Sequence, residues 1–176
     1  MPEFHPEIRI IGDPILTCKA KQIDCYDQSL LDLIQKMTKL MTEANGVGIA
    51  ANQVGSDLAV FITNAEGTNE VVINPEILEK TESIEAFHEG CLSLPGVYCH
   101  SNHRFNVIKV RYRDIKDINT VIEKELRGLP AVVFQHETDH LNGKLYIDGY
   151  GPIKRSMAVT KHKKYMRMLI RNRSDK

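Results

Sequence analysis

The sequence predicts an α+β fold, in which antiparallel or mixed sheets surround a central helix that carries a His-Glu-x-x-His motif, with another helix at the C-terminus. Several segments have the character of β-strands and two or three have the character of helices. They do not alternate as the strand–helix–strand units of a parallel sheet would. At 176 residues the chain is long enough for one ordinary domain. We therefore expect a single domain over residues 1–176.

The first predicted helix lies within residues 27–45. Its apolar residues recur at steps of three and four, which places them on one face. Asp27 or Ser29 can cap its N-terminus, and Asn45-Gly46 can end it. The apolar positions are Leu30, Leu31, Ile34, Met37, Leu40 and Met41.

Four segments are predicted as strands. Residues 58–65 and 71–77 are rich in β-branched side chains and flank a turn-like stretch at 66–69. Residues 106–114 alternate between apolar and charged positions, as a half-exposed strand does. Residues 120–126 could pair with them as a hairpin.

The helix that carries the histidine motif follows these strands. Gly128 and Pro130 open it, because proline is tolerated in a first turn, and Asn142-Gly143 ends it. A last helix is predicted within residues 157–172. The sequence contains no internal repeat, low-complexity segment or interdomain linker.

A formal net charge of +0 hides an asymmetry along the chain. Residues 153–176 hold nine lysines or arginines and one acid, a net charge of +8, so residues 1–152 carry −8. We expect a basic helical tail over about 153–176. It could contact nucleic acid, such as ribosomal RNA, or an anionic surface, or it could be a well-solvated terminal helix.

The composition, 42% hydrophobic and 26% charged, is typical of a globular protein. No signal peptide is recognisable, and no apolar stretch approaches the roughly 18 residues of a membrane span. We expect a cytoplasmic protein without membrane contact, with an organelle as the alternative. Four cysteines are sparse for a disulfide framework. Cys18, Cys25 and Cys99 lie outside any motif and are expected to be structural.

Residues 135–142 read QHETDHLN and contain the pattern His-Glu-x-x-His. Residues four apart on a helix project from the same face, so His136 and His140 can bind one metal ion, with Glu137 beside it to transfer a proton. The alternative is a polar helix face with two solvated histidines. The spacing favours a catalytic metal site.

Such a site needs a third protein ligand and leaves a fourth position to water. Common metalloproteases take that ligand from a later histidine or glutamate, but no glutamate follows His140, His162 lies in a Lys-rich run and Asp148 lies in a Gly-rich turn. Upstream, the segment EGCLS offers the thiolate of Cys91, and Gly90 leaves room for the backbone beside a metal. The alternative for Cys91 is a small buried apolar residue.

Residues 46–53 read GVGIAANQ and formally satisfy the dinucleotide fingerprint G-x-G-x-x-A. That fingerprint needs a preceding strand and a following helix, whereas here a helix precedes it and an extended segment is expected to follow. We therefore expect no nucleotide cofactor. A sharp turn remains, in which glycines let the backbone approach a ligand and the amide of Gln53 could donate to an oxyanion. The alternative is a helix C-cap with a surface glutamine.

Taken together, GVGIAANQ, EGCLS and QHETDH, in this order and at these separations, closely resemble the three motifs of the peptide deformylase family. The resemblance implies a metal-dependent hydrolase that removes the formyl group from N-formylmethionine on newly made polypeptides and releases formate. It implies one divalent ion, Fe²⁺ in the first place, with Zn²⁺, Ni²⁺ or Co²⁺ also accepted.

The resemblance also implies a role for particular residues. Glu137 would be the general base and acid, and Gln53 and the backbone N–H of Leu92 would donate to the oxyanion. Glu89 and Ser93 would orient the ligand loop. The implied metal ligands are Cys91, His136 and His140.

An apolar pocket beside the metal would receive the unbranched methionine side chain. Three of its candidate residues share the helical face of His136, and the others lie in or beside the other two motifs. Each of them could instead simply fill the core. The candidates are Leu129, Val132 and Val133, and Val47, Gly48 and Phe87, with Leu92 beside them.

Two positions depart from the family pattern. Many bacterial members have an arginine a few residues after EGCLS that contacts the substrate backbone, whereas the first arginine after this motif here is Arg104. Family members also tend to have an arginine near the pattern DPxL, and this chain has Thr17 there. The peptide preference could therefore differ. Two other functions compete: a general metallopeptidase, against which the missing downstream ligand argues, and a non-catalytic module that is metal-stabilised or associated with RNA.

Overall fold

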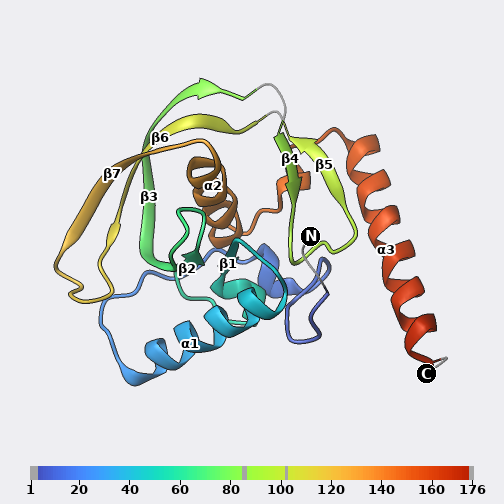
Figure 1. The fold of residues 1–176 in the computed structure, drawn as a ribbon, viewed down its shortest axis with the longest axis horizontal. Coiled ribbons are helices and arrows are strands. Elements are labelled where there is room, and N and C mark those ends of the chain that lie inside the picture. The colour runs from blue at the N-terminus through green and yellow to red at the C-terminus, as the bar shows by residue number, and fades with distance from the viewer. Residues whose placement is uncertain (1–3, 85–86, 102, 175–176) are drawn as a thin grey trace.

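The computed structural model describes residues 4–84, 87–101 and 103–174 and has the expected α+β architecture. In Figure 1, long strands curve around a central helix, a second helix lies below them, and the C-terminal helix stands along one side. The helices are α1 (Gln28–Glu43), α2 (Leu129–Leu141) and α3 (Pro152–Ser174), with 3-10 turns η1 (Pro14–Thr17), η2 (Ala51–Val54) and η3 (Tyr146–Gly149). The strands are β1 (Gly48–Ala50), β2 (Val60–Thr63), β3 (Glu70–Ser83), β4 (Phe87–Gly90), β5 (Tyr98–Ser101), β6 (Phe105–Arg113) and β7 (Val121–Arg127).

The strands form two antiparallel sheets. One has five strands in the order β1-β2-β3-β6-β7, and the other is the hairpin of β4 and β5. The register of β3 against β6 shifts between Ile73 and Glu76 and again between Ile77 and Glu79. Such irregularities bend a strand and increase its twist. The large sheet accordingly curves around α2 (Figure 1).

Helix α1 begins and ends close to the predicted positions. The side chain of Asp27 accepts a hydrogen bond from the backbone N–H of Leu30, so Asp27 and not Ser29 caps the helix. After the helix, Asn45 has a φ of 52°, a left-handed conformation that asparagine tolerates better than most residues. Leu31 is 42% exposed, so its predicted place on the buried face was wrong: it directly follows the buried Leu30 and points elsewhere.

The five-stranded sheet separates α1 from α2. On β2, Val60 and Ile62 join an apolar cluster that includes Met37 of α1. Phe61, between them, faces the opposite side, where its ring meets that of Phe134 of α2 edge-on at a centroid distance of 5.1 Å. Nine of the 13 residues of α2 are buried. Its polar side chains therefore need partners inside the protein.

A third apolar cluster lies beneath α3. It includes Leu94, Tyr146 and Ala158, and on the same side of α3 the Nδ1 atom of the buried His162 lies 3.1 Å from the carbonyl oxygen of Pro95. Among the described residues, no helix combines the length and the apolar character that a membrane crossing requires.

Several elements extend beyond the predicted ranges or were not predicted. The prediction for β3 ended at residue 77, but the strand continues to Ser83 through exposed polar residues that pair with β6. The short strands β1, β4 and β5 have no alternating apolar pattern and are defined by their backbone pairing. Helix α3 starts at Pro152, before the helix predicted within 157–172 and close to the start of the helical tail predicted over about 153–176.

Two equivalent substitutions on α1 test the packing of the sheet on this helix. Leu40 is 2% exposed and Leu31 is 42% exposed. We expect Leu40→Ala to lower the free energy of unfolding by about 2–5 kcal/mol, because it leaves a cavity. Leu31→Ala should cost less than about 1 kcal/mol. Denaturant unfolding of both variants with the same metal load measures the difference, and equal losses would contradict this account of the core.

Candidate active site

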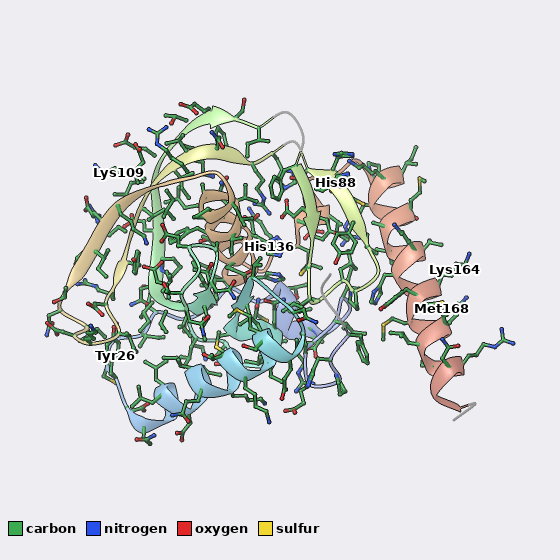
Figure 2. The ribbon with its side chains drawn as sticks, in the orientation of Figure 1. Tyr26, His88, Lys109, His136, Lys164 and Met168 are labelled. Carbon is green, nitrogen blue, oxygen red and sulfur yellow. The ribbon has the colours of Figure 1, made fainter. Side chains whose placement is uncertain are left out.

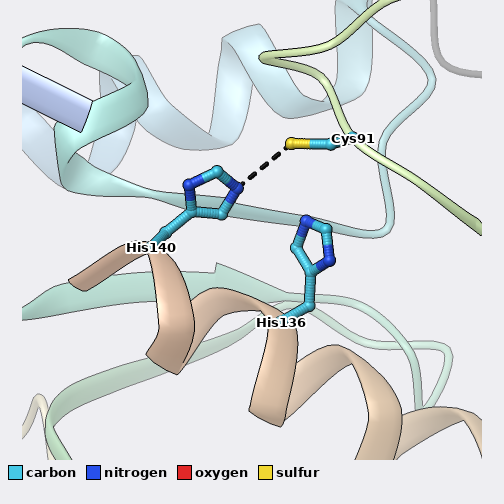
Figure 3. Close-up of side chains that lie close together, drawn as sticks. All are labelled: Cys91, His136 and His140. Carbon is cyan, nitrogen blue, oxygen red and sulfur yellow. Dashed lines mark hydrogen bonds between the residues drawn. The ribbon is translucent and has the colours of Figure 1, made fainter. Parts of the chain in front are cut away.

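Three side chains from two distant segments converge near the centre of the molecule. Cys91 follows β4, and His136 and His140 lie one turn apart on α2 (Figure 3). One ligand atom from each residue lies within 4.8 Å of the other two, and all three residues are buried. Cys91 Sγ and His140 Nε2 lie 3.1 Å apart. A thiolate and two imidazoles form a ligand set suited to several divalent transition metals, so the three residues could hold one ion.

The polar surroundings of Cys91 keep its sulfur in place. The backbone N–H of Ser93 points at Cys91 Sγ over 3.3 Å, and that of Leu94 donates to the carbonyl oxygen of Cys91 at 3.0 Å. Of the remaining cysteines, Cys18 and Cys25 are exposed, so neither fills space in the core.

Glu89 orients the ring of His136 through its Nδ1 atom. Its Oε1 lies 2.6 Å from His136 Nδ1. The ring therefore donates through Nδ1 to the carboxylate, which leaves the lone pair of Nε2 for a metal ion. Burial alone would raise the pKa of the Glu89 carboxyl, but hydrogen bonds and charge from His136 and Arg104 lower it instead. Glu89 thus remains ionised as the acceptor.

Arg104 links this carboxylate to α2. Its guanidinium donates to both oxygens of Glu89, at 2.5 and 3.1 Å, and to Oδ2 of Asp139 at 2.5 Å. Arg104 is only 3% exposed and does not line the cavity described below. It therefore does not take the place of the substrate-contacting arginine. Neither its buried pairing nor the partner role of Asp139 was predicted, because a buried charge is recognisable only from its tertiary partners.

Glu137 lies beside the three ligands in a strongly desolvated position. It is 3% exposed, and its Oε2 has no hydrogen-bond partner among the described residues. Burial raises the pKa of Glu137 to about 7, against the opposing charges of His136 and Arg104. A carboxyl group with such a pKa can both accept and release a proton near neutral pH.

Gly48 allows the backbone of β1 to approach Glu137. A Cβ atom built on Gly48 would lie 2.5 Å from Glu137 Oε1 and 2.9 Å from Val133 Cγ1. The sequence predicted a sharp turn within residues 46–53, but Gly48 belongs to a strand and has no positive φ; the close approach of the backbone that was predicted with it is observed. The requirement for glycine here is therefore the lack of space and not the backbone conformation.

Gln53 follows on η2 and is almost fully buried, so it is not a surface glutamine. Its Oε1 accepts a hydrogen bond from the backbone N–H of Ala50 at 2.8 Å. The side-chain nitrogen is thereby directed to the other side, where it donates to Ser93 Oγ at 3.1 Å and lies 3.8 Å from Cys91 Sγ. A fixed amide donor consequently stands next to the metal ligands.

A cavity of about 300 Å³ opens beside this group of residues. Val132 and Val133 are buried in its wall, whereas Val47 and Leu129 are 47% and 43% exposed. Tyr98 also lines it, although its sequence context gave no indication of this. All six pocket candidates line the cavity: Val47, Gly48, Phe87, Leu129, Val132 and Val133. The other predicted site residues that line it are the metal-ligand candidates Cys91 and His136, the proton-transfer candidate Glu137, and the oxyanion donors Gln53 and Leu92.

The two downstream residues that a metalloprotease would need as ligands lie elsewhere. His162 contacts Pro95 under α3. Asp148 accepts from Arg155 at 2.9 Å and from the backbone N–H of Leu145 at 2.8 Å. Neither belongs to the group of ligand atoms around Cys91.

Comparison with known proteins agrees with this geometry. The family model described as Polypeptide deformylase matches residues 6–156. The peptide deformylase of Thermotoga maritima is 43% identical over 148 residues, 84% of this chain and 88% of the relative. That of Mesorhizobium japonicum is 40% identical over 160 residues, 88% of this chain and 89% of the relative.

Solved structures agree as well. The crystal structure of a peptide deformylase from Legionella pneumophila superposes with a TM-score of 0.87 at 37% identity and covers 93% of this chain and 96% of that one. The family match, the identities over most of the chain and the shared fold have one consequence: this chain belongs to the peptide deformylase family.

Proposed function

We propose that the chain removes the formyl group of N-formylmethionyl peptides with the residues around Cys91, His136 and His140. The observation that carries this assignment is the placement of three convergent ligand atoms, all within 4.8 Å of one another, beside the buried Glu137 and a largely apolar cavity. Peptide deformylases are metal-dependent hydrolases, and the chain has the ligand set for one ion.

Cys91, His136 and His140 would hold the ion, which when bound would supply Lewis-acid chemistry towards water and the formyl carbonyl. Glu137 accepts the proton of the attacking water and later delivers it to the departing amine. Its pKa of about 7 suits both steps. Gln53 Nε2 and the backbone N–H of Leu92 donate to the oxygen on which negative charge develops. The hydrogen bond between Gln53 Oε1 and Ala50 holds the amide in this orientation before substrate arrives.

The cavity is proposed to receive the methionine side chain. Val132 and Val133 form a buried apolar wall next to Glu137, and Leu129 and Phe87 continue the lining. An unbranched thioether adapts well to such a surface. The substrate is proposed to be the N-terminus of a nascent polypeptide, and the place of action the cytoplasm, with a protein-synthesising organelle as the alternative. No nucleotide cofactor or membrane partner belongs to this proposal.

For the native ion we propose Fe²⁺. A thiolate with two imidazoles also suits Zn²⁺, Ni²⁺ and Co²⁺, so the ligands alone do not select it. Measuring the metal content of protein purified without oxygen identifies the ion.

The basic tail suggests a second contact. We propose that residues 1–176 act as one domain. Within it, we propose that α3 contacts ribosomal RNA. In support, Ala158 and His162 are buried against the rest of the chain, whereas a row of cations is exposed along the helix. Lys164 and Met168 mark part of this exposed surface in Figure 2. Among the described side chains of α3, the exposed cations are Lys154, Arg155, Lys161, Lys163, Lys164, Arg167 and Arg171.

Glu137→Gln tests the proton-transfer role. The amide keeps the shape of the side chain but cannot accept the proton, so we expect kcat for formate release from formyl-Met-Ala-Ser to fall about 100- to 10,000-fold. The metal content should stay unchanged. Glu79→Gln, at an exposed position on β3, should retain full activity. A loss smaller than about tenfold for Glu137→Gln would remove this residue from the mechanism.

The ligand assignment has a spectroscopic test. After chelation and reconstitution with Co²⁺, we expect a near-ultraviolet thiolate-to-metal charge-transfer band. Cys91→Ser should lose the band and the formate release, whereas Cys18→Ser, which alters an exposed cysteine, should keep both. A band that survives in Cys91→Ser would refute the thiolate ligand. Cleavage of internal bonds in unformylated peptides would instead favour a general metallopeptidase.

The tail is tested by charge reversal and not by truncation, because deleting α3 would uncover the cluster beneath it. We expect Lys161→Glu, Lys164→Glu and Arg171→Glu together to weaken ribosome binding and flatten its salt dependence, with activity on a short peptide retained. The matched control reverses three exposed lysines elsewhere: Lys19, Lys80 and Lys116. Equal ribosome binding by both triple variants would refute the role of α3.

A further inference from the structure

A pair of histidines lies on the β4–β5 hairpin, apart from the candidate metal centre. His88 and His100 face each other directly across the two strands. Their Nε2 atoms are 2.7 Å apart, and both side chains are exposed. Figure 2 labels His88 on β4, in the hairpin between α2 and α3. His88 also lines the substrate cavity, next to Phe87.

The two rings are arranged so that their nitrogens converge. The ring centroids are 3.8 Å apart, farther than the Nε2 atoms, and the ring planes cross at 57°. An ion bound by two imidazoles at about 2.0–2.1 Å holds their nitrogens about 2.8–3.4 Å apart for bond angles between 90° and 109°. The two nitrogens therefore need to separate by about 0.1–0.7 Å and the rings to tilt away from each other, which exposed side chains can do by rotation.

The backbone beneath the pair is held on both strands. On β4, the neighbouring Glu89 is fixed from the opposite face of the hairpin by the guanidinium of Arg104. On β5, Lys154 Nζ of α3 donates to the carbonyl oxygen of His100 at 2.8 Å. The pairing of the two strands brings the imidazoles together before any ligand binds, which reduces the entropic cost of binding.

Both rings can become ligands without a change in total charge. In the neutral pair, one Nε2–H donates to the Nε2 lone pair of the other ring. When an ion binds, the donating ring loses its proton from Nε2 to water and gains one at Nδ1. Each ring then keeps a single proton, on Nδ1, and both Nε2 lone pairs are available.

We propose that His88 and His100 form a second site, for a borderline divalent transition-metal ion such as Zn²⁺, Ni²⁺ or Cu²⁺. Imidazole nitrogens favour these ions over Mg²⁺ and Ca²⁺, which prefer oxygen ligands. Water completes the coordination, since the site is exposed. An ion held there adds bulk and positive charge on His88, a residue that lines the substrate cavity, and hinders entry of the peptide.

Equilibrium dialysis of the zinc-loaded enzyme against increasing Zn²⁺ tests the site directly. We expect one more ion per chain than the number held at the Cys91 centre, and loss of that additional ion in His88→Ala and in His100→Ala. His5→Ala is the matched control, because this histidine contacts Glu43 instead of another histidine; it should bind as many ions as the parent. Circular dichroism checks that all variants are folded.

A kinetic measurement tests the position of the site. Added Zn²⁺ should raise KM for formyl-Met-Ala-Ser in the parent and in His5→Ala, with kcat unchanged, and should leave KM unaffected in His100→Ala. The site is overturned if the parent binds no additional ion, or if His100→Ala still binds it. An additional ion that leaves KM unaltered in the parent would overturn its placement at the cavity.

Discussion

The buried ion pair between Arg104 and Glu89 is the interaction on which the centre depends. Each residue is 3% exposed, and a buried charge is strongly destabilising unless it is paired and hydrogen-bonded. Arg104 therefore has to lie between β4 and α2, where it meets Glu89 on one side and Asp139 on the other. Glu89 in turn fixes the ring of His136. One guanidinium thus ties the segment that carries Cys91 to the helix that carries both histidines.

The burial of α2 by the curved sheet determines the electrostatics of the site. Because β1 passes close to the helix at Gly48, water is largely kept from Glu137, and its pKa rises. The same strand leads into η2, which places Gln53 next to Cys91. The desolvation of Glu137, the position of the Gln53 amide and the apolar wall of the cavity therefore all follow from the packing of β1 and η2 against α2.

The sequence was informative wherever a side-chain pattern repeats over several residues. The predictions for α1, α2, β6 and β7 agree closely with the observed bounds. It was uninformative for β1, β4 and β5, which are three or four residues long and exist through pairing with distant segments. The second half of β3 was missed for the same reason, since its exposed polar residues are held by β6. The turn predicted within residues 46–53 is replaced at Gly48 by strand β1, because pairing with β2 decides the backbone conformation there.

The sequence by itself determined that His136 and His140 lie on one face of a helix, because a spacing of four residues fixes their relative direction through local hydrogen bonds. It also supplied the three motifs that carry the family resemblance. Only the tertiary structure decided that Cys91 meets these histidines, that Glu137 is desolvated and that Arg104 is buried away from the cavity. It also paired His88 with His100 across a hairpin that has no apolar pattern. These features depend on contacts between residues far apart in the chain, and local patterns do not encode such contacts.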